Sequence, residues 1–273
     1  MTEHRFHTPD PIRLLVQTGK GSVRLSATDT QETYVRVEGR GAEDAVSRED
    51  DQISIIAPRT RSGFLGGEPE LDVTVILPAD SEARVRTGSA DIEVEGRLGQ
   101  CQVKSGSGEI VIAAVEAATA VETGSGDIEV RRAAAPLRVK SGSGDVRLGS
   151  VQAATAVSVG SGDVEVQRAE GATAVKTGSG DLVVTEVRGD LSFTTGSGDL
   201  SVGTAHAGSL VANGASGDVE VGVPGGVPVW TDITTTTGSI RSSLVGAGQP
   251  EEGQDHLEIR ARSVTGDIVL RQL

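Results

Sequence analysis

The sequence predicts an all-β protein folded as a single-stranded parallel β-helix, or β-solenoid, with 18-residue rungs and irregular capping ends. A glycine-rich phrase returns at a fixed interval, apolar and polar residues alternate after it, and only 2% of residues are aromatic. The phrase reads TGSGDIEV at Thr123, SGSGDVRL at Ser141 and TGSGDLVV at Thr177. Its glycines recur 18 residues apart, as at Gly124 and Gly142. Such a short fixed period is typical of repeats that each pack only on their neighbours.

Each rung is expected to hold two short strands whose inward side chains are apolar. Side chains alternate across a strand, so residues at fixed offsets from the Asp of the phrase should stack inside the coil. One position after that Asp come Ile92, Ile110, Ile128, Val146, Val164, Leu182, Leu200 and Val219; three positions after it come Val94, Ile112, Val130, Leu148, Val166, Val184, Val202 and Val221; twelve positions after it come Val103, Val121, Val139, Val157, Val175, Phe193 and Val211.

The direction of winding follows from a general preference. Crossovers between parallel strands are almost always right-handed, so a right-handed coil is predicted. Eighteen residues are also the length of a three-sided, left-handed rung made of hexapeptides. The sequence contains one strong apolar phrase per rung rather than three equal ones, which favours the first arrangement.

One continuous domain with three segments is predicted. Residues 1–83 form degenerate rungs and an N-terminal cap, residues 84–223 form the regular solenoid, and residues 224–273 form degenerate rungs and a C-terminal cap. Charged and glycine-rich stretches at 59–69 and 245–255 predict loops. Trp230 is a candidate to cover the core at the C-terminal end, because solenoids need atypical terminal repeats.

Composition narrows the classes of partner. The net charge is −14, from 39 acidic and 25 basic residues, and this surface should repel nucleic acid. Cys101 is the single cysteine, the N-terminus lacks a signal-peptide pattern, and no run of about 18 apolar residues occurs. We therefore expect a cytoplasmic protein that does not insert into membranes, and a buried thiol at Cys101.

The GSGD turns form a predicted structural ladder. Its members are Gly124, Gly126, Asp127, Gly142, Gly144, Asp145, Gly160, Gly162, Asp163, Gly178, Gly180, Asp181, Gly196, Gly198 and Asp199. Each Asp is expected to accept hydrogen bonds from N–H groups of its own turn, as Asp commonly does. Calcium held between rungs is the alternative, with Asp127, Asp145, Asp163, Asp181 and Asp199 as weak candidate ligands. One loop per 18 residues, rather than one per nine, favours the turn role.

No catalytic or cofactor-binding residue is predicted, and no cofactor is expected. A polysaccharide-cleaving β-helix enzyme would need clustered carboxylates and aromatic platforms, yet the chain has one Trp, one Tyr and three Phe. The four histidines lack metal-ligand spacing. Thr and Ser columns beside the glycines could order water, as in ice-binding proteins, but tight turns use the same residue types.

The repeated phrase T-G-S-G-D-[IVL]-x-V, the segment PGGVPVWTDITTTTGSI and the closing TGDIVLRQL resemble the DUF4097 family of adhesin-like β-strand-repeat proteins. The resemblance covers nearly the whole chain. It implies a parallel β-helix and supplies no catalytic residues. The predicted function is a non-enzymatic scaffold or protein-interaction module, acting through a protein partner or self-association. The alternatives are a polymer-forming structural protein and a carbohydrate-active β-helix enzyme.

Overall fold

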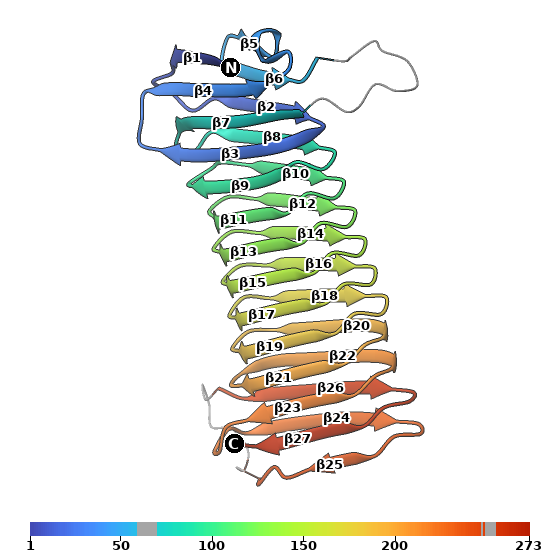
Figure 1. The fold of residues 1–273 in the computed structure, drawn as a ribbon. Helices are drawn as coiled ribbons and strands as arrows, with labels where there is room; N and C mark the ends of the chain where they lie inside the picture. The colour runs from blue at the N-terminus through green and yellow to red at the C-terminus, as the bar shows by residue number, and fades with distance from the viewer. Residues whose placement is uncertain (59–69, 247, 249–254) are drawn as a thin grey trace, which may run out of the picture. The chain divides into compact units, whose positions relative to one another are not determined.

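The computed structural model describes residues 1–58, 70–246, 248 and 255–273. Its contacts divide the chain into two compact units, Met1–Leu137 and Arg138–Leu273. Both units are all-β (Figure 1), and the one helical element in the described residues is the 3₁₀ turn η1 (Ala42–Asp44). No helix of this part of the chain has the length and hydropathy that a membrane span requires. The predicted loop at 59–69 and most of the one at 245–255 lie outside the described residues.

The first unit contains two sheets of mainly parallel strands. One follows the order β1 (Thr2–His7), β4 (Glu32–Gly39), β7 (Glu70–Pro78), β3 (Lys20–Thr28), β9 (Asp91–Gly96), β11 (Ile110–Val115) and β13 (Ile128–Ala133). The other follows the order β12 (Thr119–Thr123), β10 (Cys101–Ser105), β8 (Glu82–Thr87), β2 (Arg13–Thr18), β6 (Gln52–Ile56) and β5 (Val46–Glu49). Cys101 pairs with Thr119 and Ile110 with Ile128, so equivalent residues of successive phrases are neighbours.

The second unit has the same two-sheet construction. One sheet follows the order β15 (Val146–Val151), β17 (Val164–Ala169), β19 (Leu182–Val187), β21 (Leu200–Ala205), β23 (Val219–Val223), β27 (Ile268–Gln272) and β25 (Ile240–Ser242). The other follows the order β14 (Leu137–Ser141), β16 (Thr155–Val159), β18 (Thr173–Thr177), β20 (Leu191–Ser197), β22 (Gly208–Ser216), β26 (Leu257–Ser263) and β24 (Val229–Thr235). Val164 pairs with Leu182, and Val175 with Phe193.

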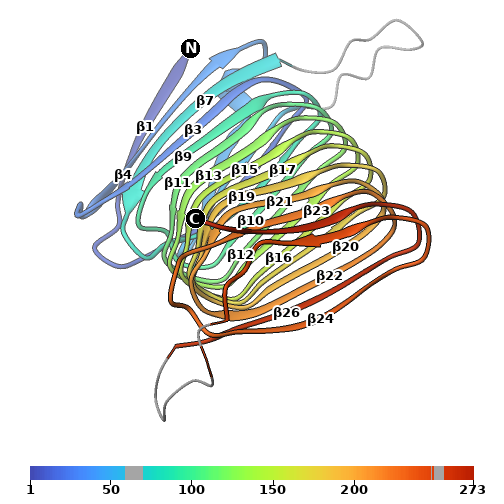
Figure 2. The same ribbon diagram turned by 90° about the horizontal axis from the view of Figure 1, so that it is seen from below.

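The core of each unit consists of stacked aliphatic columns. Strands β16 and β18 alternate buried and exposed residues without exception. The inward residues of the first two predicted columns are all buried, from Ile92 and Val94 to Val219 and Val221. Figure 2 shows the layers of strands, joined by turns, between which these side chains lie. Full burial of one such side chain contributes about 1.5–3 kcal/mol, so the columns account for most of the stabilisation.

The third predicted column is wrong at its last member. Phe193 pairs with Ala212 rather than with Val211, and Leu191 pairs with Leu210. The preceding strand pair keeps the regular register, so the additional residue enters in the turn before β22, where Gly208 has φ 99°. Because side chains alternate across a strand, this one-residue shift turns Val211 away from the core and points Ala212 into it.

Rungs at both chain ends stack out of sequence order. In the first unit β2 lies between β6 and β8, and β3 lies between β7 and β9. In the second unit β26 lies between β22 and β24, and β27 lies between β23 and β25. Strands β1, β4 and β7 pair antiparallel, as do β5 and β6. The repeated phrase does not reveal this order, because an exchanged rung carries the same inward residues as a sequential one.

The prediction that Trp230 covers the core is wrong. Its side chain is 69% exposed. Val229 and Thr231 are in register with the buried residues Leu257 and Ile259, whereas Trp230 pairs with the outward-facing Glu258. Alternation along β24 therefore directs Trp230 to the outer surface.

Candidate functional site: the carboxylate ladder

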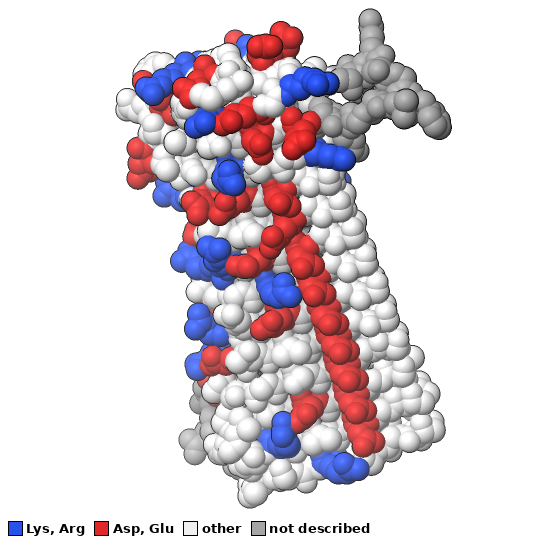
Figure 3. All heavy atoms as spheres, in the orientation of Figure 1, with Lys and Arg blue, Asp and Glu red and all other residues white. Residues whose placement is uncertain are grey.

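One carboxylate per rung lies on the outer surface, beside the start of the strand that follows each GSGD turn. Figure 3 shows acidic side chains gathered into a row that crosses successive strands. In the second unit we call this row the acidic ladder; it consists of Asp145, Asp163, Asp181, Asp199, Asp218 and Asp267. The first unit carries the equivalent residues Asp91, Glu109 and Asp127.

Successive members of the acidic ladder are joined by hydrogen bonds from main chain to carboxylate. In each case the Oδ1 atom accepts the N–H of the next member. The donor–acceptor distances are 3.0 Å for Asp163 to Asp145, 2.9 Å for Asp181 to Asp163, 2.8 Å for Asp199 to Asp181, 2.8 Å for Asp218 to Asp199 and 2.7 Å for Asp267 to Asp218. Hydrogen bonds to an ionised acceptor are the stronger kind, and here they offset the repulsion of stacked carboxylates.

The same residues also join the rung before them. The N–H of Val164 donates to the main-chain oxygen of Asp181, and that of Leu182 donates to Asp199, both at 2.9 Å. Asp181 and Asp199 thus each accept one N–H through the carbonyl and another through the carboxylate. The carboxylate therefore fixes the register between successive rungs at the position where the strand begins after its turn.

This arrangement corrects the predicted hydrogen-bond partner of the Asp side chains, which is the next rung rather than their own turn. The N–H groups of the turn instead donate to the hydroxyl residue at the start of the phrase. Gly126 N–H donates to Thr123 Oγ1 at 3.1 Å, and Gly144 N–H donates to Ser141 Oγ at 2.9 Å. Both residue types occur in most of the phrases, so the sequence contained both acceptors without indicating which donor each one takes.

The ladder glycines are required by close approach between rungs. A Cβ atom on Gly162 would lie 2.3 Å from the main-chain oxygen of Gly144, and one on Gly180 would lie 1.9 Å from that of Gly162. Gly160 and Gly178 meet the oxygens of Gly142 and Gly160 in the same way, at 2.3 and 2.5 Å. Among the described glycines of the predicted ladder none has a left-handed φ, so their need is for space rather than for special backbone angles.

The charges around these columns are partly paired. Arg241 approaches Asp267 at 3.5 Å, and Lys104 pairs with Glu122 at 2.6 Å in the first unit. Such exposed pairs each contribute well under about 1 kcal/mol. Within the described part of the chain, no three His, Cys, Asp or Glu side chains are grouped so that they could hold a metal ion.

Removing one ladder carboxylate should loosen the stack locally. In Asp181→Ala the N–H of Asp199 loses its acceptor, and we expect the free energy of unfolding to fall by about 1 kcal/mol. Asp181→Asn is the matched control, because its amide oxygen still accepts that N–H and it removes one of several neighbouring charges. Urea unfolding followed by far-ultraviolet circular dichroism checks both variants. Equal losses in the two would contradict the hydrogen-bonding role.

The last ladder carboxylate should make stability depend on pH. Ser239 N–H donates to Asp267 Oδ1 at 2.8 Å, and this hydrogen bond, with a smaller contribution from Arg241, lowers the pKa of Asp267 below its usual 3.8. A carboxyl whose pKa is lowered by folding stabilises the fold above its unfolded pKa and loses that contribution as pH falls through the folded pKa. The urea midpoint of the wild type should therefore exceed that of Asp267→Asn at pH 7, and the difference should shrink below pH 3.8. A constant difference would contradict the assignment.

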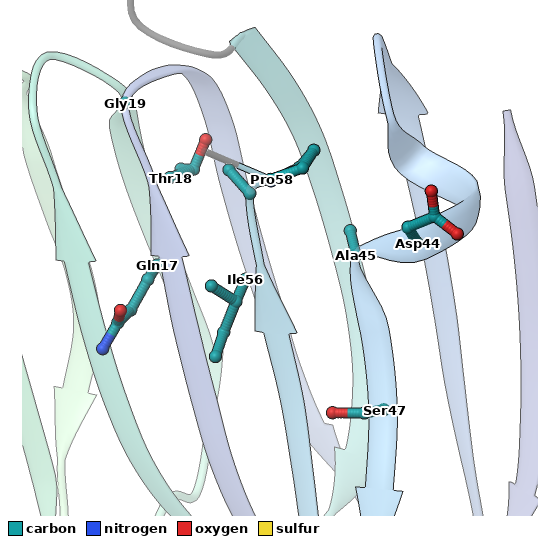
Figure 4. A pocket seen from close by; sticks show the side chains of 9 residues that line it. Gln17, Thr18, Gly19, Asp44, Ala45, Ser47, Ile56 and Pro58 are labelled. Atoms are coloured by element: carbon teal, nitrogen blue, oxygen red, sulfur yellow. The ribbon is translucent and has the colours of Figure 1, made fainter. Parts of the chain in front are cut away.

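An open pocket of about 600 Å³ lies in the first unit, at the ends of β2 and β6 and the start of β5. Figure 4 shows Ile56 and Pro58 on one side, with Asp44 and Ser47 across from them. Among the described residues, its lining includes one carboxylate and no Lys, Arg or His. Thr18 Oγ1, the buried hydroxyl in the lining, already donates to the main-chain oxygen of Lys20. The described lining residues therefore do not indicate a particular ligand or reaction.

Cys101 is a buried thiol, as predicted. It is 4% exposed, and burial raises its pKa to about 12. A thiol held neutral and away from solvent is a poor nucleophile, so Cys101 belongs to the core of the first unit.

Stacked parallel strands with one GSGD turn per repeat define an all-β repeat protein of the β-solenoid type. The chain belongs to the DUF4097 family, described as Toastrack, whose model matches residues 13–173 and again 120–271. This match confirms the resemblance seen in the repeated phrase.

Two solved structures align with nearly the whole of this chain at low sequence identity. The first is a "putative cell adhesion protein" from Clostridium sporogenes, with 11% identity over 100% of this chain and 99% of that chain and a TM-score of 0.20. The second is a "Putative lipid binding protein" from Parabacteroides distasonis, with 13% identity over 97% of this chain and 96% of that one and a TM-score of 0.33. No curated protein matches the chain. At these TM-scores neither structure bears on the function.

Proposed function

We propose that this protein is a cytoplasmic, non-enzymatic scaffold or protein-interaction module, folded as a right-handed single-stranded parallel β-helix with 18-residue rungs. The observation that carries the proposal is the acidic ladder. Its members repeat at the strand spacing of about 4.8 Å and are held in place by hydrogen bonds from the next rung. A row of charges on rigid strands is suited to binding a partner and does not require catalysis.

The ladder carboxylates retain acceptor capacity for a partner. An ionised carboxylate has about four lone-pair sites, and the hydrogen bond from the next rung uses one of them on Oδ1 of Asp163, Asp181 and Asp199. A protein surface offering Lys or Arg side chains is the matching chemistry. Each exposed ion pair is weak, so affinity would come from engaging several rungs at once.

The lining of the described pocket supports a non-enzymatic role over a carbohydrate-active enzyme. Hydrolysis of a glycosidic bond uses two carboxyl groups flanking the substrate, and the described residues of the pocket include the single carboxylate of Asp44. The scarcity of aromatic residues also disfavours sugar-binding platforms.

The test compares partner capture by the wild type and two triple variants of equal net charge. Asp163→Asn/Asp181→Asn/Asp199→Asn neutralises the ladder and keeps an acceptor oxygen in each rung. Glu95→Gln/Glu165→Gln/Glu170→Gln removes three charges elsewhere on the outer surface. We expect proteins captured by the wild type to be lost with the first variant, kept with the second and released by moderate salt. The same proteins captured by all three forms would overturn the proposal.

A further inference from the structure

At the C-terminal end of the second unit, no described strand lies beyond the last rung. In the described residues β24 pairs with β26 alone, and β25 pairs with β27 alone. Inward positions of this rung are in register with fully buried residues, as Ile240 is with Ile268, yet Ile240 is 46% exposed. Among the described residues, the apolar columns of the second unit therefore end without a covering strand.

Strand β24 also presents unpaired main-chain groups at this end. The N–H of Leu257 donates to the main-chain oxygen of Pro228 at 2.9 Å. Main-chain groups alternate in direction along a parallel ladder, so those of Trp230 and Asp232 point toward β26, and those of Thr231 and Ile233 point toward the open edge. An unpaired edge of this kind is a template for another strand.

The sequence of this edge does not oppose pairing. Strand β24 reads VWTDITT, with β-branched and aromatic residues, one charge, and neither Gly nor Pro. Protected edges usually contain several charges, a proline, a bulge or a covering segment. A short stretch with high β-propensity and low charge is the kind that adds strands.

The end strands of the first unit differ in these respects. Strand β1 reads TEHRFH and strand β5 reads VSRE, and each runs antiparallel to its neighbour. The Arg48 guanidinium lies 5.6 Å from the centre of the Phe6 ring and donates to the main-chain oxygen of His7 at 3.2 Å. Charged end strands that contact each other in this way are protected against pairing with a further strand.

Strands β24 and β25 and the turn between them are neutral in net charge, although the chain carries a net charge of −14. Residues 229–242 contain one acidic and one basic side chain, Asp232 and Arg241. Asp232 lies 3.5 Å from Arg262, and Arg241 lies 3.5 Å from Asp267. Two identical ends can therefore approach without placing unpaired like charges against each other.

We propose that this end is a dimer interface, in which β24 of one copy pairs antiparallel with β24 of a second copy of the chain. The partner must bring an equally unprotected edge. Strand β24 presents such an edge over seven residues, whereas β25 spans three residues, one of them Arg241. An interface of one surface with its own copy is closed by a two-fold axis, so assembly stops at two. This inference concerns the end of the second unit and does not depend on the ladder function.

Sedimentation velocity of the full chain across a wide concentration range tests it. The wild type should pass from 27.9 kDa to twice that mass and no further. Thr231→Pro should stay at 27.9 kDa at every concentration, because proline removes an outward-pointing N–H and leaves the pairing with β26 intact. A wild type that remains monomeric throughout would overturn the proposal.

Arg5→Pro is the matched control on the end strand β1 of the first unit. Thr8 N–H donates to the oxygen of Gln31 at 2.8 Å, in register with the β1–β4 pairing, so antiparallel alternation directs the N–H of Arg5 away from β4. This variant should dimerise like the wild type. Species larger than a dimer that disappear in Arg5→Pro would instead indicate head-to-tail growth and overturn the two-fold interface.

A crosslinking experiment covers the case in which Thr231→Pro fails to fold. Cys101 is buried, so an introduced exposed cysteine is the reactive thiol. With a short bismaleimide, Thr234→Cys on β24 should give a covalent dimer, and Glu3→Cys on β1 should not. Equal crosslinking of the two variants would contradict the proposal.

Discussion

Replacing Phe193 with alanine should lower the free energy of unfolding by about 3–5 kcal/mol, among the largest effects expected of a core substitution. Phe193 is 2% exposed and lies in its column between Val175 and Ala212. The small side chain of Ala212 provides the room that the ring fills. Truncation would leave a cavity in a stack whose strands are tied on both sides, so the site has little freedom to collapse.

The measurement is urea unfolding followed by far-ultraviolet circular dichroism. Val183→Ala is the matched control, because Val183 lies on β19, in the other sheet of the second unit, and is 46% exposed. Its loss should remain within about 0.5 kcal/mol, as for most surface substitutions. Similar losses for both variants would mean that the Phe193 column does not carry the expected packing energy.

Adding a single methyl group at Gly180 should cost at least about 3 kcal/mol, at the upper end of overpacking effects. The new Cβ would lie 1.9 Å from the main-chain oxygen of Gly162. Main chain cannot give way as a side chain can, because moving Gly162 would also disturb its own contact with Gly144. We expect Gly180→Ala to unfold at clearly lower urea than the wild type.

Gly214→Ala separates this steric effect from a general intolerance of glycine replacement. The nearest atom to its Cβ would be Thr195 Cγ2 at 3.2 Å, the end of a side chain that can shift by a few tenths of an ångström. Its loss should be below about 1 kcal/mol. If Gly180→Ala were tolerated equally well, the close approach of successive rungs would not be what requires glycine at that position.

The proposed interface and the proposed ladder make different demands on the same unit. The ladder depends on outward carboxylates fixed by hydrogen bonds, as at Asp181, whereas the interface depends on an unprotected strand at the end of the stack. Asp181→Ala should thus leave the sedimentation behaviour unchanged, and Thr231→Pro should leave partner capture by the ladder unchanged.

Periodicity alone was enough to predict the repeating part of the fold. Inward residues such as Val166 and Val184 stack on their own equivalents, so the column is visible as a sequence period before any contact is known. The buried thiol of Cys101 and the Lys104–Glu122 ion pair follow from the same alternation. Local propensity and long-range pairing agree at these positions, which is why a one-dimensional pattern suffices.

At the terminal rungs and at the irregular turns, the sequence pattern fits more than one arrangement of the strands and therefore does not predict which one forms. Exchanging the order of terminal rungs still places inward aliphatic residues such as Ile259 against aliphatic neighbours such as Leu210. The position of β26 between β22 and β24 therefore depends on chain connections rather than on composition. The partner of Asp181 depends on which N–H lies within 3 Å, and the outward turn of Val211 depends on where one extra residue is accommodated. Each of these is a difference of register or direction between chemically similar states, and only three-dimensional packing distinguishes them.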